Sequence, residues 1–367
     1  MLSAGSGAQH VPHIFDDAPE RTRGKVVGLY AILVSANIAV WLWALAAFHD
    51  NAFLLGTAFL AYSFGLRHAF DADHIAAIDN ITRKLMQEGR RPVAVGFFFS
   101  LGHATIVVAL VLAIAPMTAA AQQHFAALKE IGGAVATAVS AAFLFAIAAA
   151  NIVVLAQICG VLRAVGKTGR MPGEDHDHGL PQSGPIARLL RPLFALIARS
   201  WHAYPLGLLF GLGFDTATEV GLLGLSAGQA AHGLSIWSIL IFPALFTAGM
   251  SLMDTADSTI MVGTYGWAFV NPIRKLHYNV TVTFASIVAA LVIGSIEALS
   301  LIGDKFALQG PLWRLVARLS ENLGLIGYLL VAFFVVCWLA SFLLYKLGSY
   351  DEIQISAEPR GRSLSKI

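Results

Sequence analysis

The sequence has little charge and almost no cysteine. Only 13% of its 367 residues are charged, whereas 57% are hydrophobic. Soluble domains carry roughly a quarter charged residues, so this balance predicts an integral membrane protein. The formal net charge of +2 is too small to indicate a nucleic-acid-binding protein. Its two cysteines, Cys159 and Cys337, have neither the spacing nor the neighbours of a disulfide framework or a zinc site.

The first 25 residues lack the apolar core of a cleavable signal peptide and contain several acids. We therefore expect residues 1–25 to form a cytoplasmic tail and the first membrane helix to act as the targeting signal.

Eight apolar segments are long enough to cross a bilayer, which takes about 20 residues per helix. They lie near 26–48, 52–79, 93–116, 131–157, 204–228, 234–262, 278–303 and 324–346. Such uninterrupted runs exclude a β-barrel, whose strands are short and alternate. The sequence thus predicts an all-α, polytopic bundle of about eight transmembrane helices. The second and sixth segments are longer than a span needs, so each either tilts or breaks near its polar residues.

The distribution of basic residues predicts the orientation. With a cytoplasmic N-terminus, most of the 24 Lys and Arg lie on the cytoplasmic side, and both termini are cytoplasmic. We expect four-helix groups at 26–157 and 204–346, a cytoplasmic loop at 158–203 and a cytoplasmic tail at 347–367. The loop contains "GEDHDHG", in which His176 and His178 form either an accessory metal tract or, as we favour, part of a solvated linker.

In four of the apolar segments we single out ionisable residues, which cost a few kcal/mol each within a membrane and so indicate function. By segment, these residues are His68, Asp71, Asp73 and His74 in the second, His103 in the third, Asp215 and Glu219 with Thr218 beside them in the fifth, and Asp254 and Asp257 in the sixth. Arg67 is the one cation placed within these segments.

The spacing of these residues places them on common helix faces. At about 100° per residue, His68, Asp71 and His74 share one broad face, while Asp73 points elsewhere unless the helix is distorted there. The acidic pairs of the fifth and sixth segments are i,i+4 and i,i+3 neighbours. Each segment therefore presents a polar stripe, as the lining of a shared interior site requires.

Imidazole nitrogen and carboxylate oxygen together suit a dication such as nickel, cobalt or zinc. The set is anionic and contains no thiolate, which favours release over permanent retention. Any one of these residues alone could be a structural polar group bonded to a neighbouring helix. Clusters in four segments favour a cation site.

Four motifs resemble, in order, those of the nickel/cobalt transporter family, the secondary nickel permeases of bacteria. The first, "RHAFDADHI" (67–75), contains its His-four-residues-Asp-His signature. The others are "FFFSLGHATIVV" (97–108), "LGFDTATEV" (212–220) and "LFTAGMSLMDTADS" (245–258). Two positions depart from the family pattern: Ala104 replaces a usual serine, and Ser258 replaces a frequent glycine.

The resemblance implies high-affinity uptake of Ni²⁺, with Co²⁺ as a further cargo, across the bacterial inner membrane. It implies no resident cofactor, since the metal is the substrate, and it gives the signature role to His68, Asp73 and His74. Helical geometry instead favours Asp71, so the direct ligand is either Asp71 or Asp73. No Gly-rich phosphate loop that would bind ATP is present.

Two alternatives remain at this stage. The same site could serve nickel or cobalt efflux, because residues alone do not set the direction of transport. A metal-dependent membrane enzyme is less favoured, because the chain has neither paired histidines nor a His-Glu-x-x-His motif. The expected partners are the divalent ion, the lipid bilayer and, as a hypothesis, a cytoplasmic metallochaperone.

Overall fold

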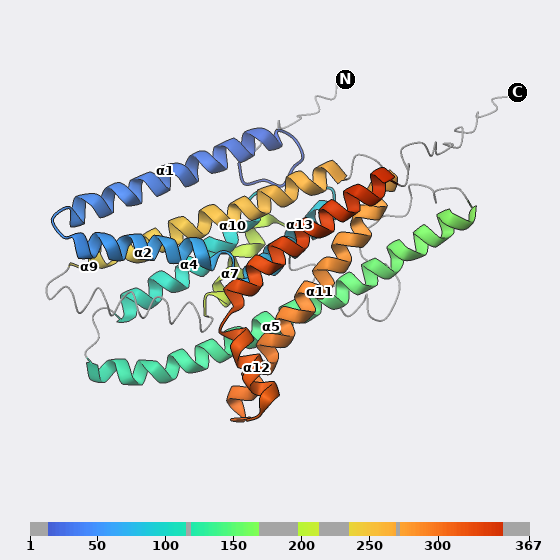
Figure 1. The fold of residues 1–367 in the computed structure, drawn as a ribbon. Coiled ribbons are helices and arrows are strands. Elements are labelled where there is room, and N and C mark those ends of the chain that lie inside the picture. The colour runs from blue at the N-terminus through green and yellow to red at the C-terminus, as the bar shows by residue number, and fades with distance from the viewer. Residues whose placement is uncertain (1–13, 115–118, 169–196, 213–234, 269–271, 348–367) are drawn as a thin grey trace, which may run out of the picture.

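All regular structure in the described residues is helical (Figure 1). The structure is a computed structural model that describes residues 14–114, 119–168, 197–212, 235–268 and 272–347. Within these ranges, five helices are long and apolar enough to cross a membrane: Thr22–Phe48, Val95–Ala113, Ile131–Gly160, Ile236–Gly266 and Val280–Lys305. The pair Pro311–Ser320 and Leu323–Cys337 also passes the test of length and composition when taken together, but it is bent by 75°, so it is either a broken sixth span or a re-entrant loop. The all-helical, multi-span architecture is confirmed, but the count of about eight is not established by the described residues.

The second predicted segment is broken rather than merely tilted. Helix α2 (Ala52–His68) ends inside the "RHAFDADHI" motif, and α3 (Ala72–Gln87) begins four residues later. Asp71 is the residue that precedes α3 and has an extended backbone, with φ −64° and ψ 140°. Helix α3 also continues beyond the predicted end of the segment at residue 79.

The sixth predicted segment behaves differently. A short helix, α9 (Ile236–Ile239), leads through Leu240 into α10 (Ile241–Ala268). Together they give a 31-residue span to Gly266 that has no break near its acidic residues. The alternative of a break near its polar residues is therefore wrong for this segment.

The helices form two packed sets, and α10 is the central element of the first set. It contacts α1 (Thr22–Phe48), α2, α3 and α4 (Val95–Ile114), and α1 lies along α2 and α10 (Figure 1). Helix α7 (Ala203–Phe210), preceded by the short helical turn η1 (Ser200–His202), packs on the other side of α4.

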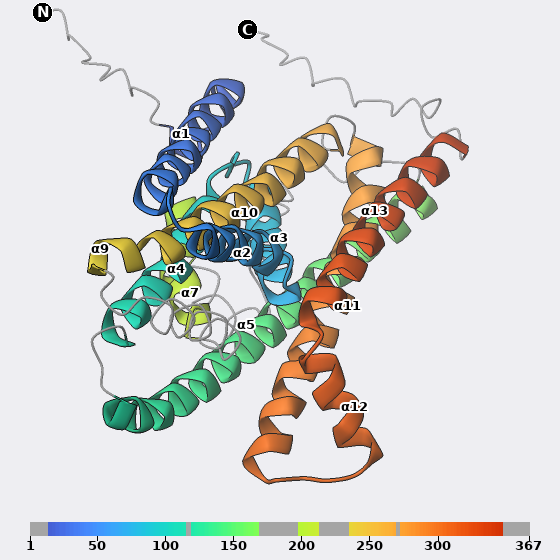
Figure 2. The ribbon, with the colours of Figure 1, turned by 60° about the vertical axis from the view of Figure 1, so that its left-hand side comes forward.

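The second set of helices lies beside the first set (Figure 2). Helix α5 (Ala119–Thr168), which extends past the predicted boundary at 157, packs against α11 (Pro272–Lys305). Helix α13 (Leu323–Leu347) lies along α11, and α12 (Pro311–Ser320) turns back beside the end of α11. The sequence interpretation missed α12, because it is amphipathic and too short for an apolar span.

Buried apolar clusters, among them the following two, pack the helices against one another. One joins α3, α5, α11 and α13 through residues such as Ile75, Leu144 and Ile293. The other joins α1, α2 and α10. The outward side chains of α1, among them Leu42 at 60% exposure, are also apolar. A helix that is apolar on both faces is typical of contact with lipid on its outer side.

Two glycines allow backbones to touch where the break and α10 are positioned. A Cβ on Gly327 of α13 would overlap the carbonyl oxygen of Phe70, which lies in the break. A Cβ on Gly96 of α4 would overlap the carbonyl oxygen of Asp254 on α10. Small residues at such crossings are the usual means by which membrane helices approach closely.

Candidate metal centre

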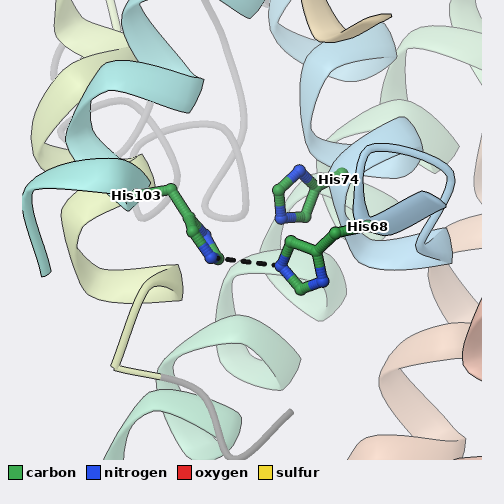
Figure 3. A group of neighbouring side chains, drawn as sticks. All are labelled: His68, His74 and His103. Carbon is green, nitrogen blue, oxygen red and sulfur yellow. Dashed lines mark hydrogen bonds between the residues drawn. The ribbon is translucent and has the colours of Figure 1, made fainter. Parts of the chain in front are cut away.

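Three buried histidines from three helices converge at the break (Figure 3). His68 is the last residue of α2, His74 lies in the first turn of α3, and His103 lies in α4. All are at most 4% exposed. One potential ligand atom from each lies within 4.8 Å of the others. The structure thus brings together histidines from two of the segments predicted to form a site.

The break is what brings His68 and His74 together. In an uninterrupted helix, residues six apart would be separated by roughly 9 Å along the axis. In the structure, the two imidazole rings have centroids 4.8 Å apart. The ring centroid of His103 is also 4.8 Å from the ring centroid of each of these two histidines. The predicted common face of a continuous helix was therefore wrong in its geometry, although it grouped residues that do lie together.

The separation of two ring nitrogens fits a shared metal. Nε2 of His68 and Nε2 of His103 are 3.1 Å apart (Figure 3). Two nitrogens bound at about 2.0–2.1 Å to one transition metal, at an angle of about 90–110°, lie roughly 2.9–3.4 Å from each other. The two imidazoles therefore already have the separation of neighbouring ligands on one ion.

Two carboxylates hold two of these imidazoles. Nδ1 of His68 is 2.8 Å from Oδ2 of Asp71, and Nδ1 of His74 is 3.4 Å from Oδ1 of Asp254. Metal-binding histidines commonly have such a carboxylate on the ring nitrogen that does not bind the metal. Within the described residues, Nε2 of His74 has no hydrogen-bond partner. Each carboxylate thus leaves an Nε2 atom directed to the centre.

Asp73 also borders the site, because the chain is distorted where the sequence required distortion. It lines one cavity together with His68, Asp71 and His103. Its Oδ1 accepts a hydrogen bond of 2.9 Å from the backbone N–H of His74. Asp71, by contrast, makes no capping bond to α3, and its carboxylate pairs with His68. The choice between Asp71 and Asp73 as direct ligand stays a prediction.

The other described candidates lie at the edges of this centre. Asp254 is fully buried, and neither its Oδ2 nor that of Asp257, one turn further along α10, has a hydrogen-bond partner among the described residues. Arg67 lies near Asp71, beside Gly324 of α13. A Cβ on Gly324 would be 3.0 Å from Oδ1 of Asp71 and 3.7 Å from Nε of Arg67.

Five candidates lie outside the described residues: Asp215, Thr218 and Glu219 of the fifth segment, and His176 and His178 of the loop. Their place in the site stays a prediction.

Sequence reasoning missed a buried polar network in α3. Asp79 accepts a hydrogen bond of 2.6 Å from the hydroxyl of Tyr265. Arg83 donates to the Thr283 hydroxyl and to the Asn80 side-chain oxygen, both at 2.9 Å. Arg83 lies beyond the predicted end of the second segment at residue 79, yet it is only 2% exposed, because α3 continues past that residue. The helical spacing of Asp79, Asn80 and Arg83 could have indicated this network.

Glu297 was also missed. It lies within the seventh predicted segment and is 5% exposed, and its Oε1 accepts a 3.0 Å hydrogen bond from Ser140 of α5. The criterion that selected the other residues, an ionisable group in an apolar run, applied equally to Glu297.

The two departures from the family motifs leave the described candidate ligands intact. Ala104 packs in an apolar cluster that includes Val107 and Met250. The hydroxyl of Ser258 donates to the carbonyl oxygen of Val93 at 3.2 Å and so joins α10 to the start of α4.

Comparison with known proteins agrees with the motifs. The family model described as high-affinity nickel-transport protein (NicO) matches residues 54–344. A high-affinity nickel transport protein of Cupriavidus necator is 53% identical over 337 residues, covering 92% of this chain and 96% of the relative. The nickel transporter NixA of Staphylococcus aureus is 42% identical over 321 residues, covering 88% and 94%. The cobalt transport protein NhlF of Rhodococcus rhodochrous is 40% identical over 348 residues, covering 94% and 97%. No solved structure matches.

Proposed function

Because the chain belongs to the family of high-affinity nickel-transport proteins, we propose that it imports Ni²⁺ across the bacterial inner membrane. The family and the relatives are transporters rather than enzymes, so the enzyme alternative is no longer needed. Nickel is accordingly the transported substrate and not a resident cofactor.

The observation that carries the site assignment is the group of three buried imidazoles on α2, α3 and α4. Neutral imidazole is a strong ligand for Ni²⁺ and Co²⁺. The buried carboxylates of Asp71 and Asp254 offset the charge of the dication, which would otherwise be costly to place in a low-dielectric interior. Direct ligation by the three histidines, with Asp73 and the fifth-segment acids completing the shell, forms part of the proposal.

The break between α2 and α3 gives the site a means of release. Its backbone joins two helices, and only three residues, 69–71, separate them. In the proposal, a change of angle at this joint moves His74 away from His68 and His103. The shared ligand separation is then lost, and the ion leaves toward the other face of the membrane. Alternating access of this kind uses discontinuous helices in other secondary transporters.

We further propose that both termini are cytoplasmic, that Co²⁺ is a second cargo and that a cytoplasmic metallochaperone receives the ion. The basic residues support the orientation. The same donor set suits cobalt, and a relative bears the name cobalt transport protein.

The test is accumulation of radiolabelled nickel in bacteria that lack their own nickel importer. Three strains are compared at equal membrane abundance: the chain, its His68→Ala variant and its His49→Ala variant. His49 follows α1, and its side chain is 70% exposed, so it controls for loss of a histidine as such. We expect accumulation that needs His68, does not need His49 and is inhibited by excess cobalt.

The same experiment distinguishes import from efflux. Accumulation below that of empty cells, again dependent on His68, would keep the site but reverse the direction. Equal accumulation in all strains and in empty cells would refute both.

A further inference from the structure

One cavity of about 280 Å³ connects the histidine centre to the surface. Its buried part is lined by His68, Asp71 and His103. Its other part is lined by residues at the ends of α11 and α12, of which Asp304 and Glu321 are exposed. The lining therefore passes from exposed carboxylates to buried imidazoles within one continuous space.

Glu297 lies between these two parts. It is on α11, seven residues before Asp304, and so roughly 10 Å deeper along the helix axis. Both residues and Ser300 line the cavity, as the i, i+3 and i+7 positions of one helix face. The Ser140 hydroxyl of α5 donates to Oε1 of Glu297, which fixes the carboxylate between α5 and α11.

The charge of the lining selects for cations. Its ionisable residues include the carboxylates of Asp71, Asp73, Glu297, Asp304 and Glu321, and no Lys or Arg is among the described residues that line it. A cleft lined by one sign of charge concentrates counter-ions and raises their association rate by roughly 10- to 1,000-fold. At about 30 Å³ per water, an ion with about six waters needs roughly 180 Å³, so the cavity admits it hydrated.

From this geometry we infer that the cavity between α5, α11 and α12 is the outer approach to the metal centre. Glu297 is its recognition carboxylate and binds the hydrated dication before the histidines replace its water. This inference rests on the proposed function and adds to it a residue outside the four motifs. Because Glu297 acts on the hydrated ion, its effect is on capture and not on the later movement of the bound ion.

The first test is the concentration dependence of nickel uptake by Glu297→Gln. Glutamine preserves the acceptor for Ser140 and removes the charge. We expect KM to rise about tenfold while the maximal rate stays within about twofold. The matched control is Glu88→Gln, because Glu88 is a partly exposed carboxylate at the end of α3 that does not line the cavity. An unchanged KM for Glu297→Gln would overturn the inference.

If Glu297→Gln fails to fold, a second measurement still tests the inference. In a chain with Cys159 and Cys337 replaced by alanine, Ser300→Cys should react with a membrane-impermeant thiol reagent added outside. Nickel should slow this reaction at concentrations near KM. Ala141→Cys, a buried position on α5 that does not line the cavity, should not react. Reaction of Ser300→Cys only from the cytoplasmic side, or not at all, would contradict an outer approach.

These outcomes separate the inference from the proposed function. If the unmodified chain accumulates no nickel, the proposed function fails. If accumulation requires His68 but Glu297→Gln behaves as the unmodified chain, only the assignment of Glu297 fails.

Discussion

Two segments of this chain are longer than a membrane span requires and carry acidic residues, yet only one of them breaks. The α2–α3 segment is interrupted at residues 69–71, whereas α10 continues past Asp254 and Asp257. The difference follows from what each contributes. The first segment supplies two imidazoles from positions six apart, and α10 supplies the carboxylate that contacts His74.

Two imidazoles that lie six residues apart in one segment can converge only if the helix ends between them. The break leaves backbone polar groups without regular helical partners, and these need protein around them within a membrane. Part of that need is met locally, since the N–H groups of Phe70 and Asp71 bond to the carbonyls of Arg67 and His68 at 2.9 Å. Gly327 of α13 covers the break at backbone contact. A single carboxylate on α10 needs no such arrangement.

The largest effect is expected from removing the imidazole on the far side of the break. His74→Ala should reduce nickel accumulation to the level of cells without the chain, because Nε2 of His74 is lost from the group of three. Radiolabelled nickel uptake at equal membrane abundance measures this, with His49→Ala as the control. Uptake by His74→Ala at the level of that control would show that transport does not need the imidazole that the break brings to His68 and His103.

A substitution at Gly327, which packs against the break, should affect folding. Gly327→Leu places a side chain against the Phe70 carbonyl and should cost about 3 kcal/mol of stability, with little folded protein in detergent. Gly263→Leu on α10 meets open space and should behave as the unmodified chain. Thermal unfolding with size-exclusion chromatography compares them. Equal stability of the two variants would mean that α13 does not support the break.

A smaller effect is expected on the unbroken helix. Asp254→Asn keeps the shape of the side chain but removes the charge beside His74, and loss of such a partner typically weakens metal affinity about 10- to 100-fold. Asp257→Asn should change it by less than about threefold, because no contact joins Asp257 to an imidazole among the described contacts. Calorimetric titration of purified protein with Ni²⁺ gives both values, and equal losses would contradict this division.

The smallest effect is expected at Ala104. Ala104→Ser restores the usual family residue next to His103. In a helix the new hydroxyl bonds to the backbone carbonyl four residues earlier rather than to a ligand. We expect the nickel uptake rate to stay within about twofold and inhibition by cobalt to change modestly. A loss greater than about tenfold would place this hydroxyl in direct contact with the ion.

The sequence predicted the helical class and the membrane location, because apolar run length and rare charge are local properties. It also placed His68, His74 and His103 in one candidate site. A break near the polar residues was one of two alternatives, and the segment itself could not decide between a break and a tilt, since the break packs against Gly324 and Gly327 some 250 residues later in the chain.

Pairings across helices were likewise beyond sequence reasoning. Asp254 contacts His74 across 180 positions, and helical spacing within either segment gives no sign of it. Glu297 and Arg83 differ, because their signals were present in the sequence. Glu297 is an ionisable residue within an apolar segment, and Arg83 follows Asp79 and Asn80 at helical spacing.

The most direct test of the metal centre is X-ray absorption at the nickel edge, on purified protein loaded with one equivalent of Ni²⁺. We expect about three imidazole nitrogens at about 2.0–2.1 Å from the metal, and loss of one imidazole from the spectrum in each of His68→Ala, His74→Ala and His103→Ala. A shell of oxygen ligands alone, unchanged by these substitutions, would show that nickel binds elsewhere in the chain.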